Sequence, residues 1–338
     1  MGLSLSSIGL GTYLGEEDAA TDAGYEASVA AALAVGINVF DTAINYRGQK
    51  SERAIGRSLA KAFAQALAQR DEVFVSTKGG YFPHDGDDPR PPRRYVQESF
   101  LESGLAPKDE IAQQCHCIAP SYLRDQVARS LENLGLSTVD LYYLHNVETQ
   151  LGAVDRKTFQ GRMKRAIETL EQEAGAGRIA AWGIATWDGL RVPPEHPEHL
   201  SMAEVLGMAK EVAGDGHHFR AVQLPSSLAM AQAVVYRSQE TGLGRRAALA
   251  AATTLGLAAF GSASIAHGRL ASGDLPEEIA EAFPGLRSSA QQALQFARSA
   301  PGVTSALVGV SSAKHALEDF ALAKVPPAAP ERILSLFA

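Results

Sequence analysis

The sequence predicts an α/β fold in which short strands alternate with longer helices from one end to the other. Each of eight apolar runs is followed by a stretch with helical spacing of its apolar residues. Several of the runs are continuously apolar, as expected for parallel strands covered on both faces. The predicted strands are 7–10, 38–41, 73–77, 141–144, 180–185, 221–224, 257–261 and 306–310. This repeated strand–helix pattern predicts a (β/α)₈ TIM barrel.

Helices are predicted in the segments between these strands. Gly36, Gly135 and Gly177 stand where helix C-terminal caps are expected. The predicted helices include residues 25–35, 51–69, 122–134, 159–174 and 314–324. Because barrels of this kind commonly hold about 250 residues or more in one unit, residues 1–338 are expected to form a single domain.

An open, doubly wound sheet is the alternative α/β architecture. It would be expected to carry a Gly-x-Gly-x-x-Gly fingerprint at its first strand–helix turn. The segment from Gly9 through Gly11 to Gly15 does not have that spacing. The closed barrel is therefore favoured.

Residues 81–120 interrupt the regular alternation. They are rich in Pro, Asp, Arg and Gly, and only residues 96–102 predict a helix. The segment follows the third predicted strand, so it should rise from the C-terminal face of the barrel, where active sites of this fold lie. Long insertions are usually functional lids or disordered loops, and we expect a substrate lid. A second, Pro-rich stretch, 189–201, follows the fifth strand and is expected on the same face.

Composition and charge exclude several classes of protein. Hydrophobic residues make up 46% and charged residues 20%, as in ordinary globular proteins. The net charge of -7 argues against a nucleic-acid partner, which requires a concentrated basic face. The basic run from Arg90 to Arg94 lies beside the acidic stretch 85–88 and is interpreted as a solvated loop. No apolar stretch reaches the roughly 18 residues needed to span a bilayer, and no signal peptide is indicated.

The cysteine and histidine pairs do not predict a metal site. Cys115 and Cys117 flank His116, but neighbours this close rarely both reach one tetrahedral ion, and no second cysteine pair completes a site. His217 and His218 are interpreted as a polar turn. Two cysteines cannot form a disulfide framework, so a reducing cytoplasm is the expected location.

Four side chains with complementary chemistry follow the predicted strands two, three and four. Asp41 and Tyr46 follow strand two, Lys78 ends strand three and His145 ends strand four. The C-terminal ends of consecutive barrel strands meet at one rim, where catalytic groups project. Taken singly, each has an ordinary structural explanation, such as a turn cap, a rim aromatic, an exposed charge or a core histidine.

Taken together, these four residues fit a proton-transfer site. A tyrosine with a pKa near 10 is a poor acid at neutral pH, and a nearby ammonium lowers that pKa by stabilising the phenolate. A buried ammonium in turn needs a carboxylate partner. Asp41, Lys78 and Tyr46 could form that chain, with His145 orienting a carbonyl oxygen. A nicotinamide hydride is the natural source of the charge that develops on that oxygen.

At these residues the sequence resembles the aldo-keto reductases over essentially its whole length. The matching motifs occur in the family's order: residues 9–12, 36–43 with Tyr46, 51–56, 76–78, 130–145, 307–311 and 318–319. The resemblance implies that Tyr46 is the general acid in reduction and the base in oxidation. It further implies that Lys78 and Asp41 tune Tyr46, and that His145 orients the substrate carbonyl.

The resemblance also implies a nicotinamide cofactor, NADP(H) more often than NAD(H), bound in extended form across the barrel mouth. The residues implied at the nicotinamide end are Gly11, Thr12, Asp41, Thr186, Gln223 and Phe260. Those implied at the pyrophosphate are Ser262, Ser264 and Gly268. Those implied at the adenosine end are Ser311, Lys314, His315, Glu318 and Asp319. Backbone amides at the start of the last helix would suit a phosphate.

Several positions depart from the family pattern. Ala185-Thr186 stands where the family usually has Ser-Asn, and Phe260 is the nearest candidate for its nicotinamide-stacking tyrosine. Asp319 stands where Asn is common, and no arginine occupies the expected 2′-phosphate position, where Lys314 or His315 could substitute.

The expected substrate is a small-molecule carbonyl or alcohol, bound by Tyr13, Tyr81 and Trp187. Its identity, and the oligomeric state, are not predicted. Two alternatives remain open at this point: a non-catalytic, nicotinamide-binding regulatory barrel like the potassium-channel β subunits, and a Schiff-base aldolase that uses Lys78.

Overall fold

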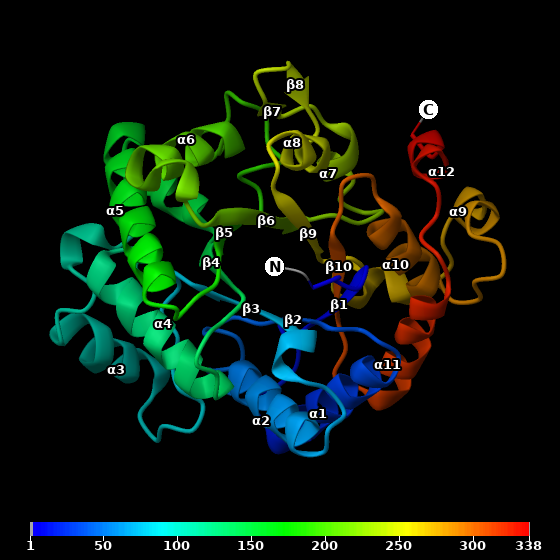
Figure 1. Cartoon of the computed structure of the whole chain (residues 1–338), viewed down its shortest axis with the longest axis horizontal. Coiled ribbons are helices and arrows are strands. Elements are labelled where there is room, and N and C mark those ends of the chain that lie inside the picture. The colour runs from blue at the N-terminus through cyan, green and yellow to red at the C-terminus, as the bar shows by residue number, and fades with distance from the viewer. Residues whose placement is uncertain (1–2, 338) are drawn as a thin grey trace.

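The computed structural model describes residues 3–337, in which eight parallel strands close into a barrel surrounded by helices (Figure 1). The strands are hydrogen-bonded in the order β1-β10-β9-β6-β5-β4-β3-β2. Their bounds are β1 (Ile8–Gly11), β2 (Val39–Asp41), β3 (Phe74–Gly79), β4 (Leu141–His145), β5 (Trp182–Ala185), β6 (Phe219–Pro225), β9 (Ala258–Ser262) and β10 (Ser305–Gly309). The predicted (β/α)₈ barrel is confirmed, and each predicted strand overlaps an observed one.

Two further strands, β7 (Gln239–Glu240) and β8 (Arg245–Arg246), form a short antiparallel pair outside the barrel. It lies between β6 and β9 along the chain, at the outer edge of the molecule (Figure 1). The barrel strands themselves follow chain order, because each returns to the sheet beside its predecessor.

The longer helices cover the outside of the barrel. They are α1 (Ala19–Ala34), α2 (Lys50–Ala64), α4 (Pro120–Leu134), α5 (Arg156–Gly175), α6 (Met202–Ala213), α10 (Ser289–Ser299) and α11 (Ala313–Phe320). The shorter ones are α3 (Pro92–Val96), α7 (Gln232–Val235), α8 (Ala248–Thr254), α9 (Glu277–Ala282) and α12 (Pro330–Ser335). Among the described residues, no helix has both the length and the apolar character that crossing a bilayer requires.

Local capping explains where these helices begin and end. The carboxylates of Asp18 and Asp155 accept backbone N–H bonds at the starts of α1 and α5. Gly135 ends α4 in the left-handed conformation, as predicted. The predicted helix 51–69 was too long, because the chain leaves α2 after Ala64 and Ala66 adopts a positive φ of 52°.

The barrel interior is filled by apolar side chains from several strands. Phe74 of β3 and Phe260 of β9 stack with ring centroids 5.6 Å apart, and Tyr143 packs edge-on against Phe260. Gly9 leaves room for this packing, because a Cβ there would lie 2.7 Å from Leu307. The interior is therefore closed, and a ligand has to bind beyond the strand ends.

The insertion 81–120 is a compact unit beside the barrel. Its predicted helix 96–102 begins earlier, as α3, and continues as a π-helical segment over Gln97–Glu102. Buried Tyr95, Phe100 and Cys117 form a small core of their own with Tyr122 at the start of α4.

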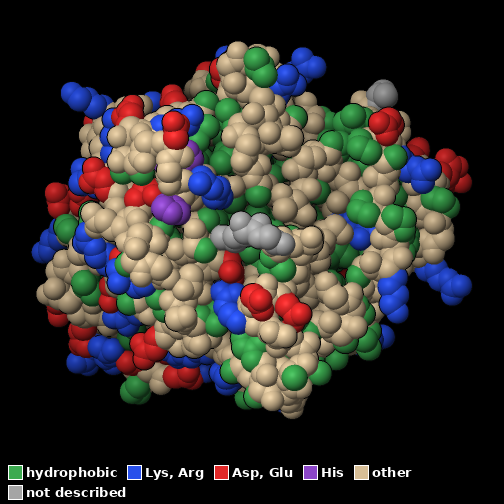
Figure 2. Space-filling model, in the orientation of Figure 1, with side chains coloured by type: hydrophobic (Ala, Val, Ile, Leu, Met, Phe, Trp, Pro, Cys, Tyr) green, Lys and Arg blue, Asp and Glu red, His purple; other side chains and the backbone are tan. Residues whose placement is uncertain are grey.

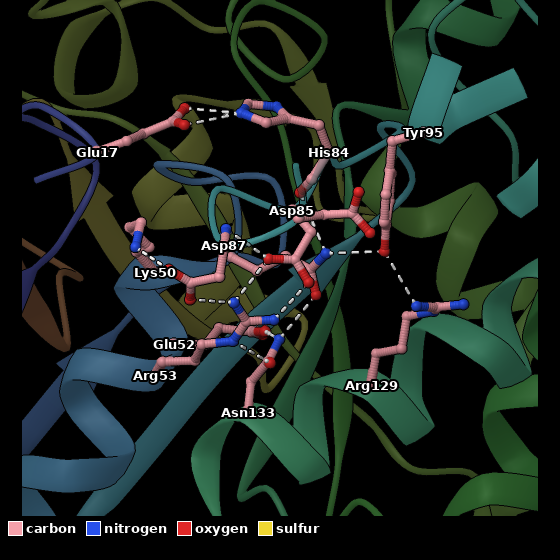
Figure 3. A network of polar contacts seen from close by, with 12 residues as sticks. Glu17, Lys50, Glu52, Arg53, His84, Asp85, Asp87, Tyr95, Arg129 and Asn133 are labelled. Carbon is pink, nitrogen blue, oxygen red and sulfur yellow. Dashed lines mark hydrogen bonds and ion pairs between the residues drawn. The ribbon is translucent and has the colours of Figure 1, made fainter. Parts of the chain in front are cut away.

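Ion pairs fasten the first part of the insertion to α2 (Figure 3). Arg53 of α2 forms a two-pronged hydrogen-bonded pair with Asp85, at 2.7 and 2.8 Å, and also contacts Asp87. Farther along, Tyr95 contacts Arg129 of α4. The basic run is likewise paired internally, since Arg90 contacts Asp88 and Glu98. Closure of this insertion over a substrate stays a prediction.

The surface charge is mixed rather than concentrated. In the view of Figure 2, Lys and Arg side chains are interspersed with Asp and Glu around the periphery of the molecule. That face therefore presents no continuous basic area of the kind that binds a nucleic-acid backbone.

Candidate active site

The four predicted catalytic residues converge at the C-terminal ends of three neighbouring strands. Asp41 is the last residue of β2, Lys78 is next to last in β3, and His145 is the last residue of β4. Tyr46 follows β2 in a turn in which its N–H donates to the carbonyl of Ala43. Parallel pairing of β2 with β3 and of β3 with β4 places these ends side by side.

Lys78 is held by a buried carboxylate. Its Nζ donates to Asp41 Oδ2 at 2.6 Å and to the carbonyl of Thr42 at 2.8 Å, and its side chain is almost completely buried. Burial alone would lower the pKa of Lys78, but the carboxylate of Asp41, followed by the hydroxyl of Tyr46, outweighs that effect and raises it. Lys78 is therefore an ammonium at neutral pH.

Asp41 is held in turn by residues from two other strands. Its Oδ1 accepts hydrogen bonds from Ser76 Oγ at 2.7 Å and from Gln223 Nε2 at 2.8 Å. With Lys78 on Oδ2, both carboxylate oxygens are engaged. This arrangement fixes the carboxylate and, through it, the position of the ammonium.

Tyr46 lies directly against this ion pair. Its ring centroid is 4.8 Å from Lys78 Nζ. Burial raises the pKa of Tyr46, and the ammonium of Lys78 opposes that rise by favouring the phenolate. The phenol is thus protonated at neutral pH, and the group that would stabilise its anion is already in place.

His145 completes the group as a neutral imidazole. Its ring centroid lies 5.8 Å from that of Tyr46. Burial, followed by the positive charge of Lys78, holds the pKa of His145 well below its usual range. Within residues 3–337 its Nδ1 has no hydrogen-bond partner. The ring is therefore uncharged at neutral pH, with one nitrogen that can donate a hydrogen bond to a ligand and one that can accept.

These residues line a cavity of about 430 Å³ at the barrel mouth. Asp41, Tyr46 and His145 contribute to its wall, and Lys78 lies behind them. All three predicted substrate-binding residues, Tyr13, Tyr81 and Trp187, also line it. Tyr81 is the single contribution of the fully described insertion 81–120 to this wall.

The predicted cofactor residues fall into two sets. Those that line the cavity are Gly11, Thr12, Asp41, Thr186, Gln223, Ser262 and Ser264. Those that lie outside its wall are Phe260, Gly268, Ser311, Lys314, His315, Glu318 and Asp319. The second set includes all the residues predicted for the adenosine end, which lie on or next to α11.

Phe260 is the one nicotinamide-end residue that the structure places elsewhere. It is buried in the barrel interior against Phe74, below the cavity, because its side chain points inward from β9. The residue that follows two positions later, Ser262, reaches the cavity instead. An aromatic contact to a ligand in this cavity has to come from other lining residues, which are Tyr13, Tyr46, Tyr81, Trp187 and the imidazoles of His145 and His267.

Sequence reasoning missed several residues of the wall. His267 lies between Tyr13 and Trp187, with ring centroids 5.5 and 5.6 Å away. Asn45 and Asn146 also line the cavity. Asn45 and Asn146 directly adjoin predicted catalytic residues, so their positions at strand ends could have identified them. His267 adopts a left-handed backbone with φ 56°, which no sequence pattern indicated.

The cavity offers polar atoms that would suit a nicotinamide carboxamide. Gln223 projects from β6 and Thr186 follows β5, so both lie beside Asp41 at the same rim. In the part of the chain that the structure describes, the buried hydroxyl of Thr186 and the buried Asn45 Oδ1 have no hydrogen-bond partner. Buried polar groups normally do have partners, which is consistent with a ligand that supplies them.

The histidine and cysteine pairs make other contacts. His116 is buried and bonds to the carbonyl of His145 and to Gln150. His218 bonds to Glu171. Within residues 3–337, no group of three or more His, Cys, Asp or Glu side chains is arranged to hold a metal ion.

Solved structures share this architecture. The fold matches an aldo/keto reductase from Klebsiella pneumoniae in complex with NADP and acetate, with a TM-score of 0.64 over 98% of this chain and 90% of that one, at 20% identity. It also matches the aldo-keto reductase AKR11C1 from Bacillus halodurans in its holo form, with a TM-score of 0.62 over 98% and 92% of the two chains, at 18% identity.

Sequence comparison gives the family. A D-threo-aldose 1-dehydrogenase from Pseudomonas sp. is 31% identical over 157 residues, which is 46% of this chain but only 42% of that protein's length. The model of the Aldo/keto reductase family matches residues 7–193, more than half of the 338 residues and all four converging side chains. The chain therefore belongs to the aldo/keto reductase family of nicotinamide-dependent oxidoreductases.

Proposed function

We propose that this protein catalyses reversible hydride transfer between NADP(H) and a small carbonyl or alcohol substrate. The observation that carries the proposal is the charged Lys78, held 2.6 Å from Asp41 and 4.8 Å from the ring of Tyr46, directly behind the cavity wall that Asp41 and Tyr46 form. This arrangement is suited to a phenol that gives up a proton and is then left as an anion.

In the direction of reduction, Tyr46 donates its proton to the carbonyl oxygen. Lys78 stabilises the resulting phenolate, and Asp41 keeps the ammonium in place as the charge develops. His145, neutral throughout, donates a ring N–H to the same oxygen and so orients the carbonyl. The chemistry that NADPH supplies when bound is a hydride for the carbonyl carbon. Tyr46 is then reprotonated from solvent, and in oxidation the phenolate acts as the base.

The charge state of Lys78 argues against the Schiff-base alternative. A lysine that attacks a carbonyl has to lose its proton, and burial or a neighbouring cation usually helps it to do so. Here the carboxylate of Asp41 raises the pKa of Lys78. Lys78 is thus suited to stabilise a phenolate, not to act as a nucleophile.

The cofactor would lie across the barrel mouth, with its nicotinamide near Gln223 and Thr186. Ser262 and Ser264, which also line the cavity, would meet the pyrophosphate, with Gly268 beyond them. Lys314 and His315 are exposed near the start of α11 and would meet the adenosine end. Two Klebsiella pneumoniae relatives of this fold are complexes with NADP and with NADPH, which supports NADP(H) over NAD(H).

The substrate would bind between Tyr13, Tyr81 and Trp187. The unpartnered Asn45 Oδ1 and the nearby Asn146 add polar groups to this aromatic wall. A wall of this composition suits a substrate with hydroxyl groups next to its carbonyl, because each hydroxyl can donate and accept a hydrogen bond. Aldoses are therefore the first substrates to test, in line with the D-threo-aldose 1-dehydrogenase relative.

The test is a panel of aldehydes, ketones and aldoses assayed by NADPH oxidation and, with the aldoses, by NADP reduction, in parallel with NADH and NAD. We expect the wild type to turn over at least one substrate and Tyr46→Phe to turn over none. NADPH should quench the protein fluorescence of the wild type and of Tyr46→Phe alike. Tight NADPH binding with no turnover on the panel would instead favour the non-catalytic regulatory barrel.

A further inference from the structure

The insertion 81–120 delivers one fully buried histidine, His116, to the back of the catalytic site. Backbone bonds lock it in place: its N–H and C=O both pair with Ala112, and the next residue, Cys117, donates to the carbonyl of Gly80. Gly80 directly follows β3, two residues after Lys78. The insertion is therefore joined to the end of the lysine strand at this point.

The ring of His116 is bonded at both nitrogens. Nε2 lies 2.6 Å from the carbonyl oxygen of His145, and Nδ1 lies 2.8 Å from Nε2 of Gln150. A carbonyl oxygen can only accept and a side-chain NH₂ can only donate. Nε2 of His116 therefore carries the hydrogen, and Nδ1 carries the lone pair.

The orientation of Gln150 is itself fixed by a cation. Its Oε1 accepts from Arg162, whose guanidinium also contacts Glu110 and the carbonyl of Asp109. Arginine can only donate, so the amide oxygen of Gln150 has to face it and the NH₂ has to face His116. Hydrogen-bond polarity thus runs in one direction from Arg162 through Gln150 and His116 to the peptide carbonyl of His145.

That carbonyl needs a donor from outside the sheet. His145 is the last residue of β4, and the chain turns at once, with Asn146 in the left-handed region at φ 45°. The N–H of the peptide between His145 and Asn146 donates to the carbonyl of Ala185 at 2.6 Å, and its C=O accepts from His116, so the two hydrogen bonds together set the plane of this peptide. The side chain of His145 projects from that peptide into the cavity.

Tyr81 reinforces the same link. Its ring packs edge-on against both His116 and His145, with centroids 5.1 and 5.2 Å away. Glycine is required nearby: a Cβ at Gly80, where φ is 145°, would lie 2.7 Å from Nε2 of His116 and 3.0 Å from the carbonyl oxygen of His145. The lack of a side chain at position 80 therefore allows the ring of His116 to reach the carbonyl of His145.

We propose that His116 is a positioning residue, whose Nε2–H bond to the backbone of His145 holds the catalytic imidazole in its productive orientation. The proposal rests on the proposed oxidoreductase function. It gives the insertion a role at the active site that does not require any closing motion.

Two amide substitutions at position 116 separate this role from general stability. In His116→Gln, the amide nitrogen occupies nearly the place of Nε2 and can still donate to the carbonyl of His145. In His116→Asn, the shorter amide reaches only the place of Nδ1. Both variants lose the ring and keep a polar side chain. Cys117→Ala, at a buried neighbour without a contact to His145, is the control for loosening of the insertion.

We expect His116→Gln to keep kcat within several-fold of the wild type. His116→Asn should lose kcat by roughly 10²-fold, the cost of a misoriented catalytic group, with the Kd for NADPH unchanged. Cys117→Ala should behave like the wild type. Equal losses in the two amide variants, measured where circular dichroism shows both folded, would overturn the proposal.

A readout without turnover makes the result independent of the proposed function. In protein labelled with ¹⁵N-histidine, His116 should show the neutral Nε2–H tautomer at pH 7, and the ring signals of His145 should shift in His116→Asn but not in His116→Gln. A protonated or Nδ1–H ring at His116, or unshifted His145 signals in His116→Asn, would reject the positioning role. If instead these signals behave as expected and no substrate turns over, only the proposed function fails.

Discussion

The two ends of the proposed cofactor site differ in how firmly they are built. At the catalytic end, Asp41, Lys78 and Gln223 are buried and joined by hydrogen bonds of 2.6–2.8 Å. At the adenosine end, Lys314 and His315 are exposed near the start of α11, outside the cavity wall. One end is preorganised by the barrel, and the other presents side chains at the surface.

This difference indicates that the two ends have different roles, in charge stabilisation and in cofactor affinity. Groups that stabilise a developing charge have to be fixed before the reaction, because reorganisation would cost part of the stabilisation. Groups that only add affinity can be ordered when the ligand binds. Substitutions at the catalytic end should therefore change kcat, and substitutions at the adenosine end should change Kd.

The largest effect is expected for Lys78→Met. It removes the charge that stabilises the Tyr46 phenolate and leaves Asp41 with an unpaired buried charge. We expect kcat for reduction to fall by roughly 10³-fold or more, in the range of general acid catalysis, while NADPH still binds. Stopped-flow NADPH oxidation measures the first and fluorescence titration the second. A Kd for NADPH that rises in proportion to the loss of kcat would contradict the different roles of the two ends.

Asp41→Asn should have a smaller effect on the same step. The amide keeps the shape of the side chain but no longer compensates the ammonium, so the pKa of Lys78 should fall and a fraction of Lys78 should lose its charge. We expect a decrease in kcat of roughly 10²-fold, greatest at high pH where more Lys78 is neutral. The pH dependence of kcat in the variant is the measurement, and a uniform loss at every pH would argue against this cause.

Acid should lower the free energy of unfolding through His116, which lies behind the catalytic end. Burial lowers the pKa of His116 from 6.5 to about 4. Between these values the unfolded chain binds a proton that the native protein does not, so stability falls as pH decreases from about 6.5 to about 4. The loss from this one group would be about 3 kcal/mol.

His116→Gln is the matched control for that acid sensitivity. The unfolding free energy of the wild type and of the variant, measured in urea from pH 7 to 4, should converge as the pH falls. Parallel curves would show that His116 does not titrate on unfolding as described.

Trp187→Ala tests the substrate wall, which lies between the two ends. Trp187 is 40% exposed, and the buried carboxylate of Glu148 accepts its backbone N–H at 2.7 Å, so the loop is held independently of the indole. Loss of the ring should raise the KM for the substrate by roughly 10-fold through lost apolar contact, with kcat less affected. A fall in kcat without a change in KM would place Trp187 in the catalytic step instead.

The smallest effect is expected for Lys314→Ala, at the adenosine end. Removing one exposed cation should weaken NADPH binding by roughly 5-fold at low salt, less at high salt, and leave NADH binding unchanged. His315→Ala provides the comparison within the same turn. Equal weakening for NADPH and NADH would show that Lys314 does not contact the 2′-phosphate.

The barrel and the convergence of the proposed catalytic residues could be predicted because they follow from the alternation of strands and helices. Residues at the ends of consecutive parallel strands have to meet at one rim, so Asp41, Lys78 and His145 could be placed together without coordinates. The helix ends were less predictable, as the left-handed Ala66 after α2 illustrates.

The inward orientation of Phe260 could not be predicted, because a shift of one residue in a strand moves a side chain to the opposite face. The contacts of His116 were equally inaccessible. They depend on an irregular insertion folding back onto β3 and β4, and no repeating pattern encodes such a contact. The Cys115-His116-Cys117 segment, for which the sequence did not predict a metal site, links the insertion to His145.

The most direct test of the account is the pH dependence of alcohol oxidation in single turnovers by the wild type and by Lys78→Met. Oxidation requires Tyr46 as the phenolate, and the ammonium of Lys78 favours that form, so the rise of the rate with pH should move to higher pH in the variant. An unchanged midpoint would show that Lys78 does not tune the tyrosine.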